Sequence, residues 1–236
     1  PYQDISPLGT LHTFTAACGT WGADDEGCTD VIFPQGFVFP FDGVNRTAAR
    51  VFVNGLASLD MTFTGDTWKN DWGYPNSSQS WANFAVLWED MRVKSSSPVT
   101  GVYSLLVGDA PARSLVIQWV DLWSLYTNEE PQTLDIQLVF HENGSFTYRY
   151  GTVEASYWSP GEYAVIGYQN AAATRSHVIA DWSPVPGGLN DRTFHFGSIP
   201  RPANGSFTFR PTESRTVLLE AVGNQQDAIE IEVNVQ

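Results

Sequence analysis

Residues 134–150 read LDIQLVFHENGSFTYRY, and this stretch decides the fold class. Apolar residues alternate with polar ones across 134–140, and the alternation resumes across 146–150. A period of two is typical of a strand with one face buried, so the stretch predicts a β-hairpin around Glu142-Asn143-Gly144.

The register of this hairpin follows from which pairing keeps both apolar rows on one face. A two-residue Asn-Gly turn would pair His141 with Phe146 and place the two rows on opposite faces. A three-residue loop with Gly144 in the left-handed region pairs Phe140 with Phe146 instead. Because a slip of one residue turns every side chain over, the second register is predicted.

Similar alternation outside the hairpin predicts an all-β chain. We expect strands at 9–16, 50–53, 57–63, 84–88, 162–170, 177–182 and 192–196. Two prolines within 31–41 restrict that apolar run to edge or bulged pieces. The predicted fold is a mostly antiparallel β-sandwich, jelly-roll-like or Greek key, with long loops. Residues 1–236 are expected to form one domain, in which 201–236 either add closing strands or form a small appendage.

Composition narrows the classes of partner. The 236 residues include 26 acidic and 12 basic side chains, for a net charge of −14. Such a charge repels nucleic-acid phosphates and anionic lipid, so neither is expected as a partner. No apolar run is long enough to insert into a membrane. The chain starts at Pro1 without a signal peptide, which we interpret as a processed N-terminus or an excised domain.

The only two cysteines, Cys18 and Cys28, enclose a short Gly- and Asp-rich loop. This spacing predicts a local disulfide in a secreted or cell-surface protein; two unrelated buried thiols are the alternative. Carboxylates crowd the same loop and are hard oxygen ligands of the kind that calcium prefers. The candidate calcium ligands are Asp24, Asp25, Glu26 and Asp30. A solvated acidic loop without a metal is the simpler alternative.

A long polar loop at 65–83 carries several aromatic residues. Loops of this length in compact domains are often functional. Aromatic rings stack on sugar faces while amides and carboxylates bind the hydroxyls. The candidate ligand-binding residues are Trp68, Asn70, Asp71, Trp72, Tyr74 and Trp81. The alternative is that these rings fold inward and cover one sheet.

Six phrases of the sequence occur in an order that resembles a known family. They are FVFPFDG, RVFVNG, FAVLWED, GVYSLLVGDAPARSLVIQW, DIQLVFHENGSFTYRYG and AVIGYQN. Together they resemble the nidogen-type (NIDO) extracellular β-sandwich module, over residues 31–169. Similar modules occur in plexin-domain-containing membrane proteins and in large secreted bacterial proteins. Asp42 stands where the family usually has an aromatic, and neither the cysteine loop nor 65–83 has a counterpart.

The resemblance implies a non-catalytic adhesion module, and the residues offer no catalytic signature against it. No nucleophile elbow, zinc-protease motif, P-loop or dinucleotide fingerprint is present. We therefore expect an extracellular recognition module for a protein or matrix partner, and not an enzyme. Carbohydrate binding through 65–83 is the alternative function, and a secreted hydrolase ranks third.

Overall fold

The computed structural model describes residues 1–15, 18–65, 67–68, 70, 74–76, 81–94, 97–124, 133–154 and 163–197. The chain divides into two compact units, Pro1–His195 and Phe196–Gln236, and all described residues but 196 and 197 belong to the first. The closing strands or small appendage expected at 201–236 lie outside the described residues.

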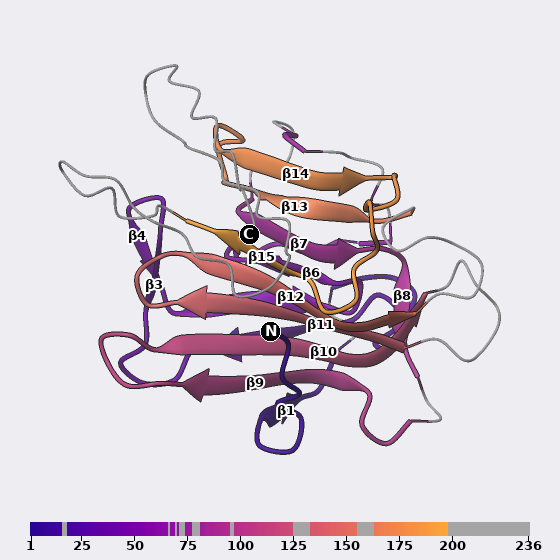
Figure 1. Ribbon diagram of the computed structural model, residues 1–236, viewed down its shortest axis with the longest axis horizontal. Helices are drawn as coiled ribbons and strands as arrows, with labels where there is room; N and C mark the ends of the chain where they lie inside the picture. The colour runs from indigo at the N-terminus through magenta and orange to yellow at the C-terminus, as the bar shows by residue number, and fades with distance from the viewer. Residues whose placement is uncertain are drawn as a thin grey trace, which may run out of the picture. The chain divides into compact units, whose positions relative to one another are not determined.

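Within the described part of the chain there are fifteen strands and no helix, which confirms the all-β prediction. A seven-stranded antiparallel sheet has the order β1-β9-β10-β11-β12-β15, with β8 pairing to β10 (Figure 1). Its strands are β1 (Thr10–His12), β8 (Met91–Val93), β9 (Gly101–Val107), β10 (Ser114–Ser124), β11 (Thr133–His141), β12 (Phe146–Glu154) and β15 (Thr193–Phe196).

A six-stranded sheet has the order β14-β13-β7-β6-β5-β2. Its strands are β2 (Cys28–Ile32), β5 (Ala48–Phe52), β6 (Leu56–Ser58), β7 (Asn83–Trp88), β13 (Val165–Gln169) and β14 (Ser176–Asp181). A separate ribbon pairs β3 (Phe39–Phe41) with β4 (Val44–Arg46). The proline-containing run at 31–41 thus supplies the end of an edge strand and one strand of a small ribbon, as Pro requires.

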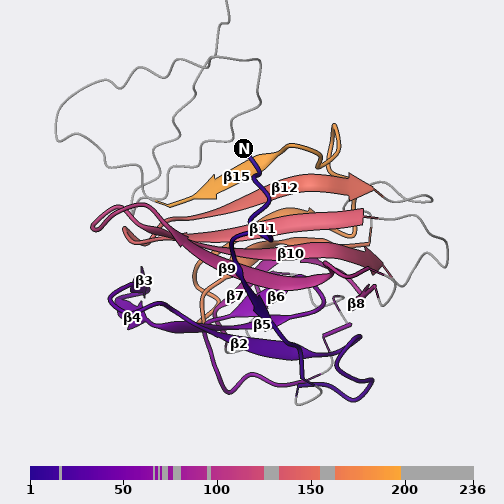
Figure 2. The same cartoon turned by 90° about the horizontal axis from the view of Figure 1, so that it is seen from below.

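The two large sheets pack face to face as a sandwich (Figure 2). All six residues of β7 are buried, and so are most residues of β10 and β11. Aromatic rings interlock between the layers: Phe84 of β7 contacts Phe140 and Phe146, with ring centroids 5.2 Å and 4.8 Å away. The sandwich prediction is therefore confirmed at the level of the core.

The predicted hairpin register is confirmed. Phe140 pairs with Phe146 and Leu138 pairs with Tyr148 across β11 and β12. Gly144 has φ 85°, in the left-handed region that only glycine enters at little cost. The apolar row of the hairpin consequently faces the six-stranded sheet.

Polar atoms of buried aromatic residues tie the two layers together. The Trp119 indole N–H donates to the Phe52 carbonyl oxygen at 2.8 Å. The hydroxyl groups of Tyr148 and Tyr150 donate to the carbonyl oxygens of Gly167 and Val86. A buried indole or phenol needs such a partner, and each bond fixes one sheet against the other.

The predicted strand at 57–63 is shorter in the structure and ends at Ser58. The Ser58 hydroxyl accepts the Asp60 backbone N–H, and Asp60 Oδ1 accepts the backbone N–H and hydroxyl of Thr62. Side-chain bonds to backbone groups two residues ahead favour a turn over a continued strand, although Phe63 stays buried.

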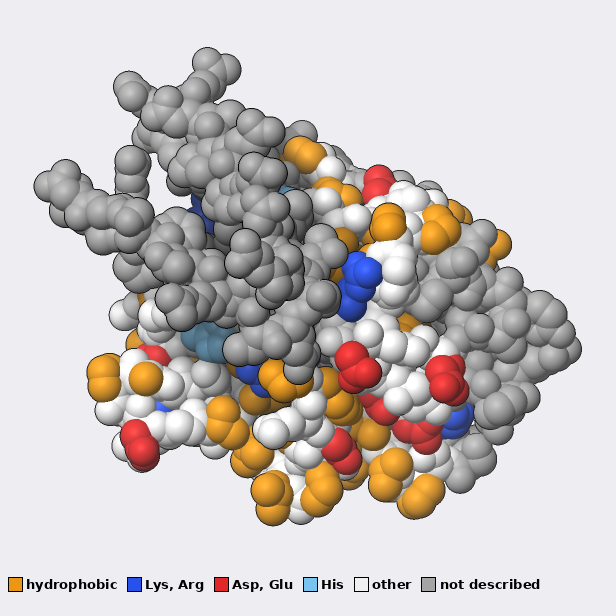
Figure 3. All heavy atoms as spheres, in the orientation of Figure 1, with side chains coloured by type: hydrophobic (Ala, Val, Ile, Leu, Met, Phe, Trp, Pro, Cys, Tyr) orange, Lys and Arg blue, Asp and Glu red, His pale blue; other side chains and the backbone are white. Residues whose placement is uncertain are grey.

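Figure 3 shows hydrophobic side chains along the edge of the seven-stranded sheet formed by β1 and β9. Leu8 and Leu11 are exposed there. The edge strand β1 has only three residues, and such a short edge limits pairing with another sheet.

No helix in the described ranges is long and apolar enough to cross a membrane.

Candidate functional site

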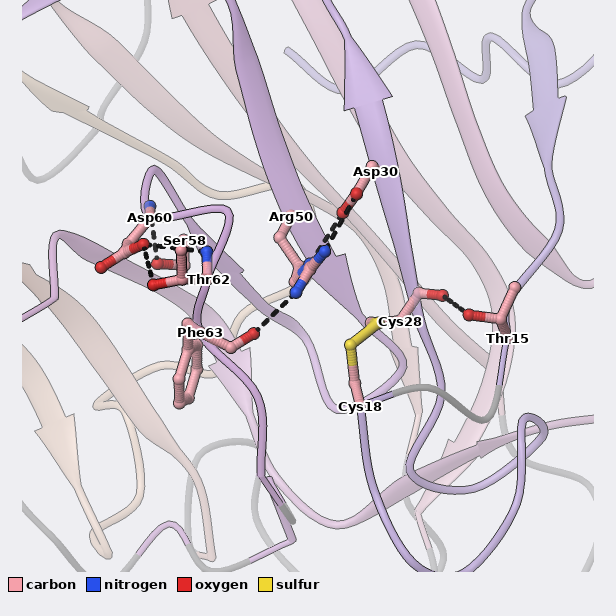
Figure 4. Close-up of polar contacts among 9 residues, drawn as sticks. All are labelled: Thr15, Cys18, Cys28, Asp30, Arg50, Ser58, Asp60, Thr62 and Phe63. Atoms are coloured by element: carbon pink, nitrogen blue, oxygen red, sulfur yellow. Dashed lines mark hydrogen bonds and ion pairs between the residues drawn. A yellow bond between two sulfur atoms is a disulfide. The ribbon is translucent and has the colours of Figure 1, made fainter.

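A disulfide joins Cys18 to Cys28 and confirms the predicted pairing, with 5.7 Å between the two Cα atoms (Figure 4). Thr15 forms a β-bridge to Cys28, so both ends of the loop are attached to the edge strand β2. Both cysteines are buried in a cluster with Phe52 and Trp88. The loop is thus anchored on the core of the sandwich.

The loop between the cysteines holds one large aromatic side chain in solvent. Trp21 has an exposed fraction of 68%. Behind it, the Glu26 backbone N–H donates to the Gly22 carbonyl oxygen at 3.0 Å. Gly27 packs so closely that a Cβ there would lie 2.1 Å from the Ala23 carbonyl oxygen. The disulfide and these contacts keep the loop compact while Trp21 remains accessible.

Three carboxyl groups, which we call the carboxyl triad, meet where this loop approaches the end of β7: Asp25 and Glu26 from the loop, and Asp90. One oxygen from each lies within 4.8 Å of the others. Asp90 follows β7, and the loop reaches it because the Val93 backbone N–H donates to the Asp24 carbonyl oxygen at 2.8 Å. Backbone pairing between β8 and the disulfide loop therefore assembles the triad.

Glu26 is the buried member of the triad and is held on both carboxylate oxygens. Asn54 Nδ2 donates to Oε1 at 2.8 Å, and the Thr67 backbone N–H donates to Oε2. Asn54 Oδ1 in turn accepts the Met91 backbone N–H at 2.7 Å. This network fixes the loop, the β5–β6 turn and the start of β8 against one another.

Among the described residues, the three carboxyl groups of the triad form an ion pair with one cation. This is Arg92, whose guanidinium lies 3.6 Å from Asp25 and stacks over Trp123. Burial raises the pKa of Glu26 to about 7, although its hydrogen bonds oppose the shift. Burial and the charge of Asp25 raise the pKa of Asp90 to about 6. Both shifts are upward, because burial and a neighbouring negative charge each disfavour the ionised form of a carboxyl group.

A fourth carboxyl, Glu89, lies beside the triad and is fully buried. Its Oε1 accepts the Ser124 hydroxyl, while Oε2 is buried without a hydrogen-bond partner. Burial, with a smaller contribution from Asp90, raises its pKa to about 8. The raised pKa favours the neutral form of Glu89 at neutral pH.

The two other predicted calcium ligands lie apart from the triad. Asp30 forms a two-pronged ion pair with Arg50, at 2.7 Å and 3.0 Å (Figure 4). Arg50 also donates to the Phe63 carbonyl oxygen, so this pair links β2 to β5 and to the loop that follows β6. The Asp24 side chain is exposed. Of the four predicted residues, Asp25 and Glu26 share the cluster, and Asp90 joins them.

The triad can reduce its mutual repulsion in two ways. The first is to retain protons, which the raised pKa values of Glu26 and Asp90 favour. The second is to bind a divalent cation, since calcium takes six to eight oxygen ligands from carboxylates, carbonyls and water. Calcium binding at this loop stays a prediction.

The described rings of the aromatic loop turn toward the protein. Trp81 stacks on Phe63 with centroids 4.0 Å apart, and Tyr74 lies 6.1 Å from Trp88. Both are partly buried and pack on the same core cluster as the disulfide. Trp68 is half-buried. Tyr74 and Trp81 thus form part of a lid over this end of the sandwich.

Asn70, in the middle of that loop, forms hydrogen bonds with three distant segments of the chain. Its Nδ2 donates to the backbone carbonyl oxygens of Trp88 and Tyr163, and the backbone carbonyl oxygen of Asn70 accepts the Trp182 indole N–H. Asn70 is 1% exposed. The remaining predicted residues, Asp71 and Trp72, lie outside the described residues.

Sequence reasoning missed Asp90 as a member of the triad and Trp21 as the exposed ring. Asp90 is 65 residues from Asp25 along the chain, and no local pattern signals that the two lie together. For Trp21 a usable signal existed, because the ring lies between two glycines in a short loop closed by cysteines.

Comparison with known proteins gave one match. A family model described as NIDO related matches residues 6–211 of the chain. No curated protein and no solved structure matched.

Proposed function

Because the chain belongs to the NIDO-related family, we propose that it is a non-catalytic recognition module that binds an extracellular protein or matrix partner. The family match covers residues 6–211, and the membership supports an extracellular role. The Cys18–Cys28 disulfide agrees with secretion or display on a cell surface, where such bonds persist.

The observation that carries the proposal is Trp21, exposed on a loop that the disulfide closes. Tryptophan is enriched among residues that dominate binding energy at interfaces. A loop held by a disulfide and by backbone bonds loses little entropy on binding, so its contacts add to affinity. The disulfide loop is therefore our candidate for the partner-binding surface.

Carbohydrate binding is the alternative, and the described contacts give it less support. A sugar-stacking platform needs exposed rings, whereas Tyr74 and Trp81 pack on the core cluster. A glycan array tests this alternative directly, and saturable binding to one glycan class would favour it over a protein partner. A secreted hydrolase ranks third, and a screen on polysaccharide and peptide substrates tests it.

The protein-partner proposal is tested by capturing ligands from an extracellular-matrix extract, purifying the captured protein and measuring its affinity. We expect Trp21→Ala to raise the Kd about 30-fold, the factor for a 2 kcal/mol hot spot. Ile32→Ala is the matched control, because Ile32 has the same exposed fraction, 68%, on β2. The proposal is wrong if no purified protein binds saturably, or if Trp21→Ala changes the Kd no more than Ile32→Ala.

A further inference from the structure

Residues 1–5, which we call the strap, cross the outer face of the seven-stranded sheet. In Figures 1 and 2 the chain runs from its N-terminus over β11 and β10 toward β1. Trp119 of β10 bonds to Phe52 of the six-stranded sheet, so its neighbour Gln118 points to the opposite, outer face. Gln137 of β11 is paired with Gln118 and points the same way. Both glutamines are fully buried.

The amide groups of these two glutamines bind the backbone of the strap. Gln137 Nε2 donates to the Gln3 carbonyl oxygen at 2.6 Å, and the Ile5 backbone N–H donates to Gln118 Oε1 at 2.9 Å. Gln137 Nε2 also donates to Gln118 Oε1 at 2.6 Å, which fixes the two amides relative to each other. A carbonyl and an N–H two residues apart lie along one edge of an extended segment, so the glutamines recognise extended backbone.

Side chains of the strap add contacts that depend on residue type. Asp4 Oδ1 accepts Gln118 Nε2 at 2.6 Å. The Tyr2 ring uses the space left by Gly151, because a Cβ there would lie 2.8 Å from Tyr2 Cε1. Ile5 is buried in an apolar cluster with Tyr103, Val116, Val120 and Val139. We call the two glutamines and this apolar cluster the strap site.

The strap is attached to the sheet only through side chains of the sheet. In the described part of the chain, no backbone–backbone hydrogen bond joins residues 1–4 to a strand, and the Ile5 carbonyl oxygen accepts the N–H groups of Leu8 and Gly9. The family match begins at residue 6, so both glutamines lie within it and the strap does not. A segment with so few contacts opens at a low free-energy cost, and its release leaves every strand paired.

One contact of the strap is unfavourable. Burial raises the pKa of Asp135, and the charges of Asp121 and Asp4 raise it further. The strap therefore brings the Asp4 carboxylate close to a second acid. A segment with asparagine at this position keeps an acceptor for Gln118 Nε2 and avoids the repulsion. The strap is thus a replaceable occupant of its own site.

We propose that the strap site binds an extended segment of a partner protein in which an aliphatic residue directly follows an asparagine, and that the strap fills the site in the partner's absence. The two glutamines bind the backbone of the segment, Gln118 also donates to the asparagine, and the apolar cluster contacts the aliphatic side chain. The source of the segment rests on the proposed recognition of a protein partner. The site itself contains no residue of the disulfide loop.

The test is an NMR titration of the full chain with a hexapeptide, blocked at both ends, that has the sequence of residues 1–6 with Asp4→Asn. The wild type is compared with the protein variant Ile5→Asn, whose strap has lost its apolar anchor. For the variant we expect saturable shifts of the Gln118 and Gln137 side-chain amides with a Kd of about 0.1 mM. The wild type should have a Kd at least about tenfold higher, because its own strap competes.

Ile32→Asn is the matched control. It makes the same change at an exposed position of β2 and should leave the wild-type Kd unchanged.

Three further comparisons locate the binding. Gln118→Met in the Ile5→Asn protein removes both the donor and the acceptor and should raise the Kd at least about tenfold, while the dispersion of the other resonances reports an intact fold. A peptide that also carries Ile5→Asn should give no saturable shift. The peptide with the original Asp4 should bind more weakly than the asparagine peptide.

Equal affinity of the wild type and Ile5→Asn would overturn the proposal, because the peptide would then bind where the strap does not compete. Unchanged binding by Gln118→Met, or no saturable binding to Ile5→Asn, would overturn it as well. Tighter binding of the Asp4 peptide would rule out the asparagine.

A concentration-dependent dimer of the wild type that Ile5→Asn abolishes, measured by light scattering, would assign the site to a second copy of the chain in place of a partner segment. Trp21→Ala should leave the peptide Kd unchanged, so this inference and the proposed partner-binding surface fail separately.

Discussion

Replacing Glu89 by glutamine tests whether the buried carboxyl beside the triad controls stability. Glu89 is fully buried, accepts the Ser124 hydroxyl through Oε1 and has no partner at Oε2. Glutamine has nearly the same shape, keeps an acceptor for Ser124 and cannot ionise. The variant therefore removes the titration while it preserves the packing.

The sign of the effect follows from the raised pKa. Burial lifts the pKa of Glu89 from 4.5 to about 8, so the folded state holds the proton more tightly than the unfolded state does. The stability from this group is present in full below pH 4.5 and is lost as the pH rises through about 8. At 1.36 kcal/mol per pKa unit, the wild type loses about 3 kcal/mol through Glu89 between pH 5 and pH 8.

The assay is urea unfolding at pH 5, 6, 7 and 8, with a chelator present so that no cation stabilises the folded state. The difference in the free energy of unfolding, Glu89→Gln minus wild type, should increase by about 3 kcal/mol from pH 5 to pH 8. At pH 5 the variant should be the less stable protein by about 1 kcal/mol, because its amide N–H lacks an acceptor.

Glu142→Gln is the control, because the pKa of Glu142 is lowered by its hydrogen bond to Arg113. Its contribution is lost as the pH falls below the usual range of a glutamate, so its difference from wild type should stay flat between pH 5 and pH 8. A flat difference for Glu89→Gln as well would refute the reasoning, since it would mean that Glu89 is ionised and solvated in the folded protein.

Three further outcomes are expected. Adding calcium at a hundredfold excess over its Kd to chelator-treated protein should raise the free energy of unfolding by about 2.7 kcal/mol. Asp90→Asn should abolish that rise, and an unchanged melting temperature in wild type would exclude a calcium site in the triad. Gly55→Ala should cost more than about 3 kcal/mol in chemical unfolding, because Gly55 has φ 68° and a Cβ there would lie 2.2 Å from the Leu87 carbonyl oxygen. Gly43→Ala, at φ 74° with no atom within 4 Å of the added Cβ, should cost only about 1 kcal/mol, and equal costs would contradict the predicted clash. The double change Cys18→Ser and Cys28→Ser should cost about 3 kcal/mol, the loop-entropy value for a loop this short, and a loss below 1 kcal/mol would show that the other loop contacts suffice.

Local patterns predicted the elements whose physics is local. The hairpin register follows from the period of two and the left-handed Gly144, and the structure pairs Phe140 with Phe146 as predicted. Trp119 belongs to an apolar row and is fully buried. Where side chains bond to neighbouring backbone groups, as Asp60 does to Thr62, the same patterns overestimated the length of the strand.

By itself, the sequence determined the all-β class, the hairpin register, the short disulfide and the family, because alternation, turn chemistry and motif order act over a few residues. Only the tertiary structure decided that Asp90 lies beside Asp25 and Glu26, and that Trp21 faces solvent while Trp81 stacks on Phe63. These placements depend on pairing between distant strands, which sets the neighbours and the solvation of each group. A carboxyl or a ring has the same local sequence whether it is buried or exposed, so its chemistry follows from packing.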